Sequence, residues 1–136
     1  MNGSERVKTI RISNGTPGPE ALIEWSVEDV AHISVTLYDG HNVSSSAPDL
    51  FESLIDLRRD LAARDLLLCC NGARLDCYPS RMSREMGKAQ KVLVLEKGKP
   101  PSARSMVDIF GEADGAKIGT PEEQESHYRD WLDSIA

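Results

Sequence analysis

The first third of the chain alternates apolar and polar residues with a period of two, the pattern of strands that bury one face. The alternation is clearest over residues 22–27 and 33–38, and the β-branched residues of Val7–Ser13 predict another strand. Two glycines and two prolines in the segment NGTPGP, residues 14–19, predict a turn. The polar segment 41–45 predicts an edge strand or a loop.

A run of leucines at spacings of four, three and four predicts the main helix, over about residues 47–64. Ser46 can cap its N-terminus, Pro48 is tolerated in the first turn, and Asp49 stands where a capping box places an acid. We expect the apolar stripe to face a sheet. The stripe consists of Leu50, Leu54, Leu57 and Leu61.

A second long helix is predicted over about residues 121–135. Thr120 offers a capping hydroxyl, Pro121 suits the first helical position, and Glu123 supplies the acid of a capping box. Trp131 lies on the apolar face and is expected to dock the helix on the rest of the chain.

Residues 79–110 predict a short helix followed by two short strands. Ser80 can cap a helix over about residues 80–87, with Met82 and Met86 on its inner face. Two apolar segments then predict strands, and an exposed edge of either could pair two copies of the chain as a homodimer. These segments are Val92–Leu95 and Met106–Phe110.

The most apolar run, residues 66–70, ends at Asn71-Gly72. This dipeptide predicts a two-residue hairpin, because a type I′ turn needs positive φ at both central positions. The resulting register sorts apolar residues, including Leu75, to a core face and places Arg74 on the other face. It also keeps Cys69, Cys70 and Cys77 apart, so we expect three reduced thiols.

The elements together predict an α+β fold. We expect an antiparallel or mixed sheet of about five to seven strands, two main helices and one short helix, because strands meet in hairpins and few helices cross between strands. A length of 136 residues fits a single domain over 1–136, with residues 1–5 as a flexible tail.

Charge is distributed unevenly along the chain. The formal net charge is −6, yet residues 71–104 carry +5 and residues 105–136 carry −6. An acidic protein with one basic strip is not expected to bind nucleic acid, because the whole molecule would repel phosphates. The sequence has no run of about 18 apolar residues and its start lacks an apolar signal-peptide core, so we expect a cytoplasmic protein without a membrane span.

Motifs for catalysis, cofactors and metals are missing from the sequence. It contains no G-x-S-x-G elbow and no glycine-rich phosphate loop, and its cysteines and histidines lack metal-site spacing. We therefore predict no catalytic residue, no cofactor and no metal. A reactive Cys69 opposite Arg74, or acid–base chemistry at Asp108 or Asp114, is the weaker alternative.

An acidic surface gives the first functional hypothesis: a non-enzymatic protein that binds and masks a basic protein partner. Its size, acidity and lack of catalytic motifs are similar in kind to those of bacterial toxin-immunity proteins. The simpler alternative is that the glutamates only favour a helix N-terminus through the helix dipole. The candidate partner-binding residues are Asp108, Glu112, Asp114, Glu122 and Glu125.

The basic strip gives the second hypothesis: a small enzyme or ligand-binding regulator that holds an anionic ligand or an acidic peptide. Three of its cations fall on one helical face, with hydroxyl donors beside them. The simpler alternative is a solvated basic face that balances the acidic C-terminal third. The candidate anion-binding residues are Arg74, Tyr78, Ser80, Arg81, Arg84 and Lys88.

Overall fold

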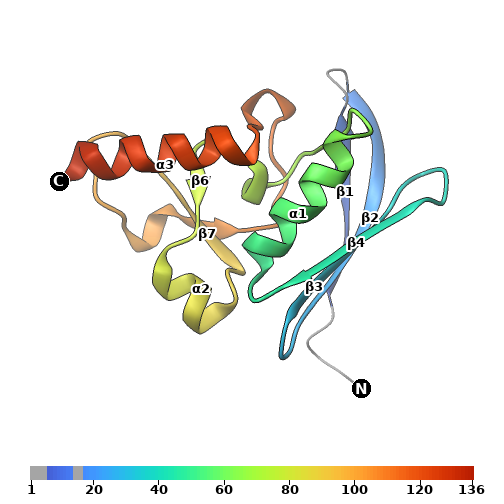
Figure 1. The fold of residues 1–136 in the computed structure, drawn as a ribbon. Coiled ribbons are helices and arrows are strands. Elements are labelled where there is room, and N and C mark those ends of the chain that lie inside the picture. Colours follow the sequence, from blue (N-terminus) through green and yellow to red (C-terminus); the bar gives the residue numbers. More distant parts are fainter. Residues whose placement is uncertain (1–5, 14–16) are drawn as a thin grey trace.

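The computed structural model describes residues 6–13 and 17–136 (Figure 1). The predicted tail, residues 1–5, and the first half of the predicted turn, residues 14–16, lie outside the described residues. The second half of that turn is already strand, because β2 begins at Pro17.

The α+β class is confirmed, with the described strands divided between two antiparallel sheets. The larger sheet has the order β4-β3-β2-β1-β5, so the polar segment after residue 40 forms an edge strand. Helix α1 contacts both edge strands, and the sheet therefore curls around it. The strands are β1 (Arg6–Ser13), β2 (Pro17–Val27), β3 (Ala31–Thr36), β4 (Asn42–Ala47) and β5 (Leu67–Leu68).

Helix α1 (Leu50–Ala62) is central to the core, and Figure 1 shows it between the large sheet and the C-terminal third of the chain. All four leucines of the predicted stripe are fully buried. The helix starts later than predicted, because Ser46 belongs to β4 and Asp49 is the cap, accepting a 2.8 Å hydrogen bond from the backbone N of Glu52. An aspartate in extended conformation is among the strongest N-caps.

The smaller sheet has the order β6-β7-β8 and lies with α2 and α3 in the C-terminal half. Its central strand is β7, so the predicted homodimer edge at Val92–Leu95 is wrong, whereas Met106 does begin an edge strand. The elements are β6 (Cys77–Tyr78), α2 (Arg81–Gly87), β7 (Lys91–Val94), β8 (Met106–Asp108) and α3 (Pro121–Ile135).

The capping residues predicted for the two C-terminal helices are confirmed. Thr120 and Glu123 form a complete capping box on α3, and Ser80 Oγ accepts a 3.0 Å hydrogen bond from Ser83 N at the start of α2. The inner face predicted for α2 is wrong, since Met82 and Met86 are 73% and 84% exposed. Polar contacts hold this helix instead, among them Ser83 Oγ donating to the carbonyl of Lys91 at 2.7 Å.

The predicted hairpin at Asn71-Gly72 is wrong. These residues form a buried 3-10 turn, η1 (Asn71–Ala73), without positive φ. Their backbone N–H groups donate to the carbonyls of Gly111 and Ile109, each at 2.8 Å. A Cβ on Gly72 would lie 2.5 Å from Ile109 and 2.6 Å from Leu54, so glycine serves close packing there.

Because the hairpin does not form, the residues on either side of Asn71-Gly72 pair with other segments than predicted. Cys70 and Arg74 bridge to the later segments at Glu112 and Ile118 instead of to each other's strand. Leu75, expected in the core, is 38% exposed. The short turns that follow are η2 (Ala103–Ser105) and η3 (Gly115–Lys117).

Within the described ranges, no helix combines the length and the apolar character needed to cross a membrane.

Candidate protein-interaction surface

Arg74 does not form the exposed basic site that the sequence predicted. Its Nε and Nη2 each donate to a carboxylate oxygen of Asp76 at 2.8 Å, and its side chain is only 16% exposed. The hydrogen bond to Asp76 raises the pKa of Arg74. A bidentate pair of this kind uses the N–H donors along one edge of the guanidinium, the same edge that a carboxylate or phosphate ligand would need.

Arg84 is likewise engaged inside the molecule. Its guanidinium lies 5.0 Å from the centre of the Phe51 ring and 5.6 Å from that of Tyr78, a cation–π arrangement. Its Nη1 also approaches Asp49 at 3.4 Å and Glu52 at 3.9 Å. Arg84 therefore ties α2 to the first turn of α1.

The remaining residues of the predicted strip are also committed, except one. The Tyr78 ring stacks on that of Tyr128 with centres 4.0 Å apart, and Lys88 Nζ donates to the carbonyls of Asp29 and Pro48. Ser80 caps α2. Arg81 alone among the six is exposed, with its Nε 3.6 Å from a carboxylate oxygen of Glu85.

The five predicted acidic residues belong to two different parts of the structure. Three lie in the segment from β8 to η3, where Asp108 is 3.0 Å from Lys91 and Glu112 is 3.8 Å from Arg11. Asp114 caps η3 through a 3.0 Å hydrogen bond from the backbone N of Ala116. Their neighbours on β1 and β7 are cationic, so this group adds little net negative charge.

The other two, Glu122 and Glu125, extend an acidic region on α1. Glu122 accepts a 2.8 Å hydrogen bond from Arg59, which lowers the pKa of Glu122. Three acids on the exposed side of α1 recur every four residues and share one helical face with Arg59 nearby. We call the following five exposed acids the α1–α3 acidic surface: Glu52, Asp56, Asp60, Glu122 and Glu125.

The ion pair between Arg59 of α1 and Glu122 of α3 brings the acids of the two helices to one side of the molecule. Burial is the main cause that raises the pKa of Tyr78, and the charges of both Glu125 and Glu52 raise it further. One side chain therefore senses carboxylates from α3 and from α1. The α1 acids were not predicted as part of a site, although their regular spacing of four residues was visible in the sequence.

Buried polar contacts fix the position of α3 against α1. Arg58 donates to the Gln124 side-chain oxygen at 2.8 Å and to the carbonyl of Gly119 at 2.6 Å, and burial lowers the pKa of Arg58 to about 10. The amide nitrogen of Gln124 in turn contacts three carbonyls around η1. The acidic surface thus rests on a rigid base.

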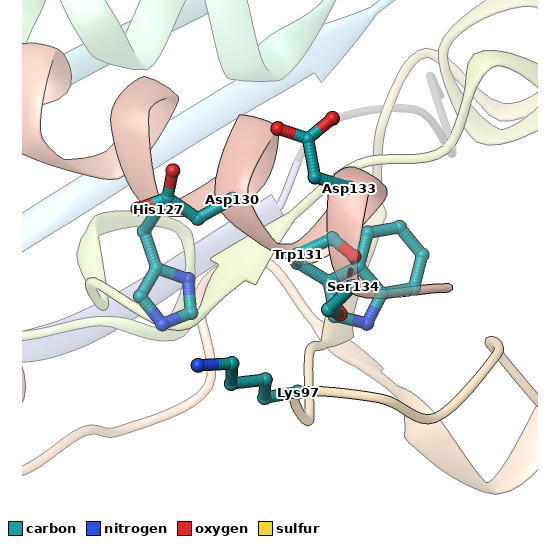
Figure 2. A pocket seen from close by; sticks show the side chains of 6 residues that line it. All are labelled: Lys97, His127, Asp130, Trp131, Asp133 and Ser134. Atoms are coloured by element: carbon teal, nitrogen blue, oxygen red, sulfur yellow. Dashed lines mark hydrogen bonds between the residues drawn. The ribbon is translucent and has the colours of Figure 1, made fainter. Parts of the chain in front are cut away.

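A recess of about 480 Å³ lies beside the C-terminal half of α3. Figure 2 shows His127 and Lys97 facing each other there. The serine of this recess is not available as a nucleophile, because Ser134 Oγ donates to the carbonyl of Trp131 at 2.6 Å and accepts from Gly98 N at 2.9 Å. No described residue hydrogen-bonds with the buried Nδ1 of His127. Asp130 and Asp133 point away from Lys97 in this view.

The three cysteines are free and buried. Burial raises the pKa of Cys70 to about 11 and that of Cys77 to about 12, and it also raises the pKa of Cys69. Nucleophilic cysteines need a depressed pKa, so these thiols are packing groups. The described part of the chain holds no cluster of three or more histidine, cysteine or acidic side chains that could bind a metal.

Comparison with known proteins adds no assignment. No protein-family model and no curated protein matches this sequence. The functional argument therefore depends on the charged surfaces themselves.

Proposed function

We propose that this chain is a non-enzymatic interaction protein that binds and masks a basic protein partner through the α1–α3 acidic surface. In this respect it would act like the toxin-immunity proteins that it resembles in kind. Three buried free thiols favour a reducing compartment, and we place its action in the cytoplasm.

One contrast carries the proposal. Three of the four cations of the basic strip, Arg74, Arg84 and Lys88, are held by carboxylates, rings and carbonyls of the same chain. The acids of the α1–α3 surface, in contrast, are all exposed. The ion pair between Arg59 and Glu122 is exposed, with 70% of the Glu122 side chain accessible. Exposed pairs are weak and can exchange for a partner's cations, and complementary charge speeds and selects association.

The test compares two variants with the same change in charge. The first neutralises the proposed surface with Asp56→Asn, Glu122→Gln and Glu125→Gln, and the second neutralises the other acidic group with Asp108→Asn, Glu112→Gln and Asp114→Asn. Each tagged protein is used to capture partners from the native host, with identification and stoichiometry by mass spectrometry.

We expect the wild type and the second variant to retain a stoichiometric basic protein that the first variant loses. Retention by the first variant with loss by the second would assign binding to the β8–η3 segment and contradict the proposed surface. Failure of the wild type to retain any basic protein would contradict the function itself.

The anionic-ligand hypothesis has less support, because only Arg81 of its six residues is exposed. If it were correct, inorganic phosphate would raise the melting temperature of the wild type, and Arg81→Ala would remove that rise. The two hypotheses thus predict opposite results from acidic and basic substitutions.

A further inference from the structure

The outer edge of β4 has backbone groups that are free to pair. In the turn before β4, Leu37 N donates to the carbonyl of His41 at 2.7 Å, so Leu37 and His41 form a hydrogen-bonded pair. In an antiparallel sheet, hydrogen-bonded and non-hydrogen-bonded pairs alternate, so every second residue of β4 after His41 is hydrogen-bonded to β3. These pairs include Val43 and Ser45. The N–H and C=O groups of Asn42 and Ser44 therefore point away from β3, and no described residue hydrogen-bonds to them.

This edge lacks the usual protection against a further strand. Edge strands are commonly blunted by lysine, proline or a bulge, and β4 has none of these over its six residues, NVSSSA. Helix α1 packs against the inner face of β4, and one of its contacts is at Ser45, whose Oγ donates to the carbonyl of Ser53 at 2.6 Å. The Ser53 hydroxyl returns a 3.1 Å hydrogen bond to the carbonyl of Ser45.

Beyond that contact, a groove of about 520 Å³ separates the edge from the C-terminal half of α1. Residues Asn42 to Ser44 line one wall. Asp60, Ala63 and Arg64 line the other. The groove therefore runs directly alongside the open backbone groups, where the side chains of an added strand would lie.

The charge of the α1 wall indicates which side chains would suit the groove. Ser53, Asp56 and Asp60 follow at i, i+3 and i+7, so they share the helical face that borders β4. Neither aspartate forms an ion pair with a described residue. Arg64 also lines the groove and disfavours a second cation beside it, so a cationic side chain is favoured on the side of Asp60, toward Asp56 one turn before it.

We propose that the edge of β4 accepts an extended segment of the basic partner as a sixth strand, with a lysine or arginine directed at Asp56 and Asp60. This inference rests on the proposed function and specifies how the partner engages. In strand addition, main-chain hydrogen bonds supply affinity and the pockets for alternate side chains supply specificity.

The first experiment uses an acetylated, amidated peptide that alternates lysine and valine, and a matched peptide that alternates glutamate and valine. Saturation with the lysine peptide is expected to slow amide hydrogen exchange of Asn42 and Ser44 by about tenfold or more, as measured by NMR. The amide of Val43, already bonded within the sheet, should be unaffected. Unchanged exchange at Ser44, or equal protection by the glutamate peptide, would overturn the proposal.

The second experiment removes one edge donor. Proline is tolerated where an edge N–H faces solvent, so Ser44→Pro should fold while losing that donor and weakening peptide binding by about tenfold or more. Ser44→Ala keeps the donor and should bind like the wild type. Asp60→Lys leaves the backbone of β4 unchanged, so it tests the charge even if the proline variant does not fold, and it should also weaken binding of the lysine peptide.

Two outcomes separate this inference from the proposed function. If the first acidic variant loses the captured basic protein while Ser44→Pro retains it, the function stands and strand addition is wrong. If sedimentation instead detects a dimer of the wild type that Ser44→Pro dissociates, the edge is occupied by a second copy of the chain, and the inference is also wrong.

Discussion

Two charged regions of this molecule have opposite relations to the fold. In the basic strip, Arg84 and Lys88 join α2 to the start of α1, and Arg74 forms a bidentate pair with Asp76 just before β6. The α1–α3 acidic surface makes exposed ion pairs such as Arg59 with Glu122. Charge alone does not distinguish a binding surface from a structural one. What distinguishes them is whether the charge is already satisfied by buried or half-buried partners.

This difference follows from how solvent acts on ion pairs. A cation under an aromatic ring or in a bidentate pair loses water on folding, so removing it leaves its partners unsatisfied. An exposed pair keeps most of its water and is screened by salt, so it contributes little to stability. The fold should therefore depend on the first kind of residue and be indifferent to the second.

The largest expected effect comes from the buried cation between the two helices. Arg58→Met should lower the free energy of unfolding by about 3 kcal/mol, because the Gln124 side-chain oxygen and the carbonyl of Gly119 would be buried without a donor. Urea denaturation measures this loss.

The adjacent Arg59 provides the matched control, since it is exposed and pairs with the acidic surface. Arg59→Met should leave the urea midpoint unchanged. Equal destabilisation by the two variants would contradict the distinction between structural and exposed charges.

A smaller effect is expected from alkaline pH, and it tests whether the central segment is buried. The pKa values of Cys70 and Cys77 rise from 9.0 to about 11 and about 12 on folding. Between pH 9 and these values the unfolded chain has lost protons that the folded protein keeps. The free energy of unfolding should therefore fall as pH rises above 9, by about 2 kcal/mol at pH 10.

Arg58 has the opposite effect on the free energy of unfolding, because its pKa is lowered to about 10 on folding. Above pH 10 the unfolded chain binds more protons at this residue than the folded protein does, so stability there rises with pH. The window from pH 9 to 10 isolates the thiols. A Cys70→Ala, Cys77→Ala variant should lose most of the pH dependence there. A wild-type curve that is flat over this window would place the thiols in contact with solvent.

Local signals in the sequence were sufficient where an element depends on its own residues. The cap, proline and acid at the start of α3 lie within four consecutive positions, and the leucine stripe of α1 needs only helical periodicity. Both helices could therefore be predicted, with the start of α1 shifted to a nearby stronger cap at Asp49.

Distant contacts explain what could not be predicted. Asn71-Gly72 carries a hairpin signal, but Gly72 is needed because Ile109 and Leu54 approach it from other segments. Arg84 looked free because its partner Asp49 is 35 residues away in the sequence. The acidic surface combines helices whose contact, Arg59 with Glu122, spans 63 residues. Its local signs were the regular spacing of the α1 acids and the acids at the start of α3, of which Glu122 and Glu125 were predicted to bind a partner.

The smallest effect concerns the one basic residue of the strip that bridges two helices. Arg84→Ala should lower the free energy of unfolding by about 1 kcal/mol, because it removes the cation–π contacts with Phe51 and Tyr78 and the ion pair with Asp49. Arg81→Ala, on the same short helix but exposed, is the control and should not change the denaturation midpoint.

The α1–α3 acidic surface provides the matching test, because its charges should not contribute to stability. The variant with Asp56→Asn, Glu122→Gln and Glu125→Gln should unfold at the wild-type midpoint in both low and high salt, because exposed charges contribute little that salt can screen. A midpoint that falls as far as that of Arg84→Ala would mean that these carboxylates hold α3 on α1. Their exposure would then no longer favour a role in binding, and the proposed surface would have to be sought elsewhere on the molecule.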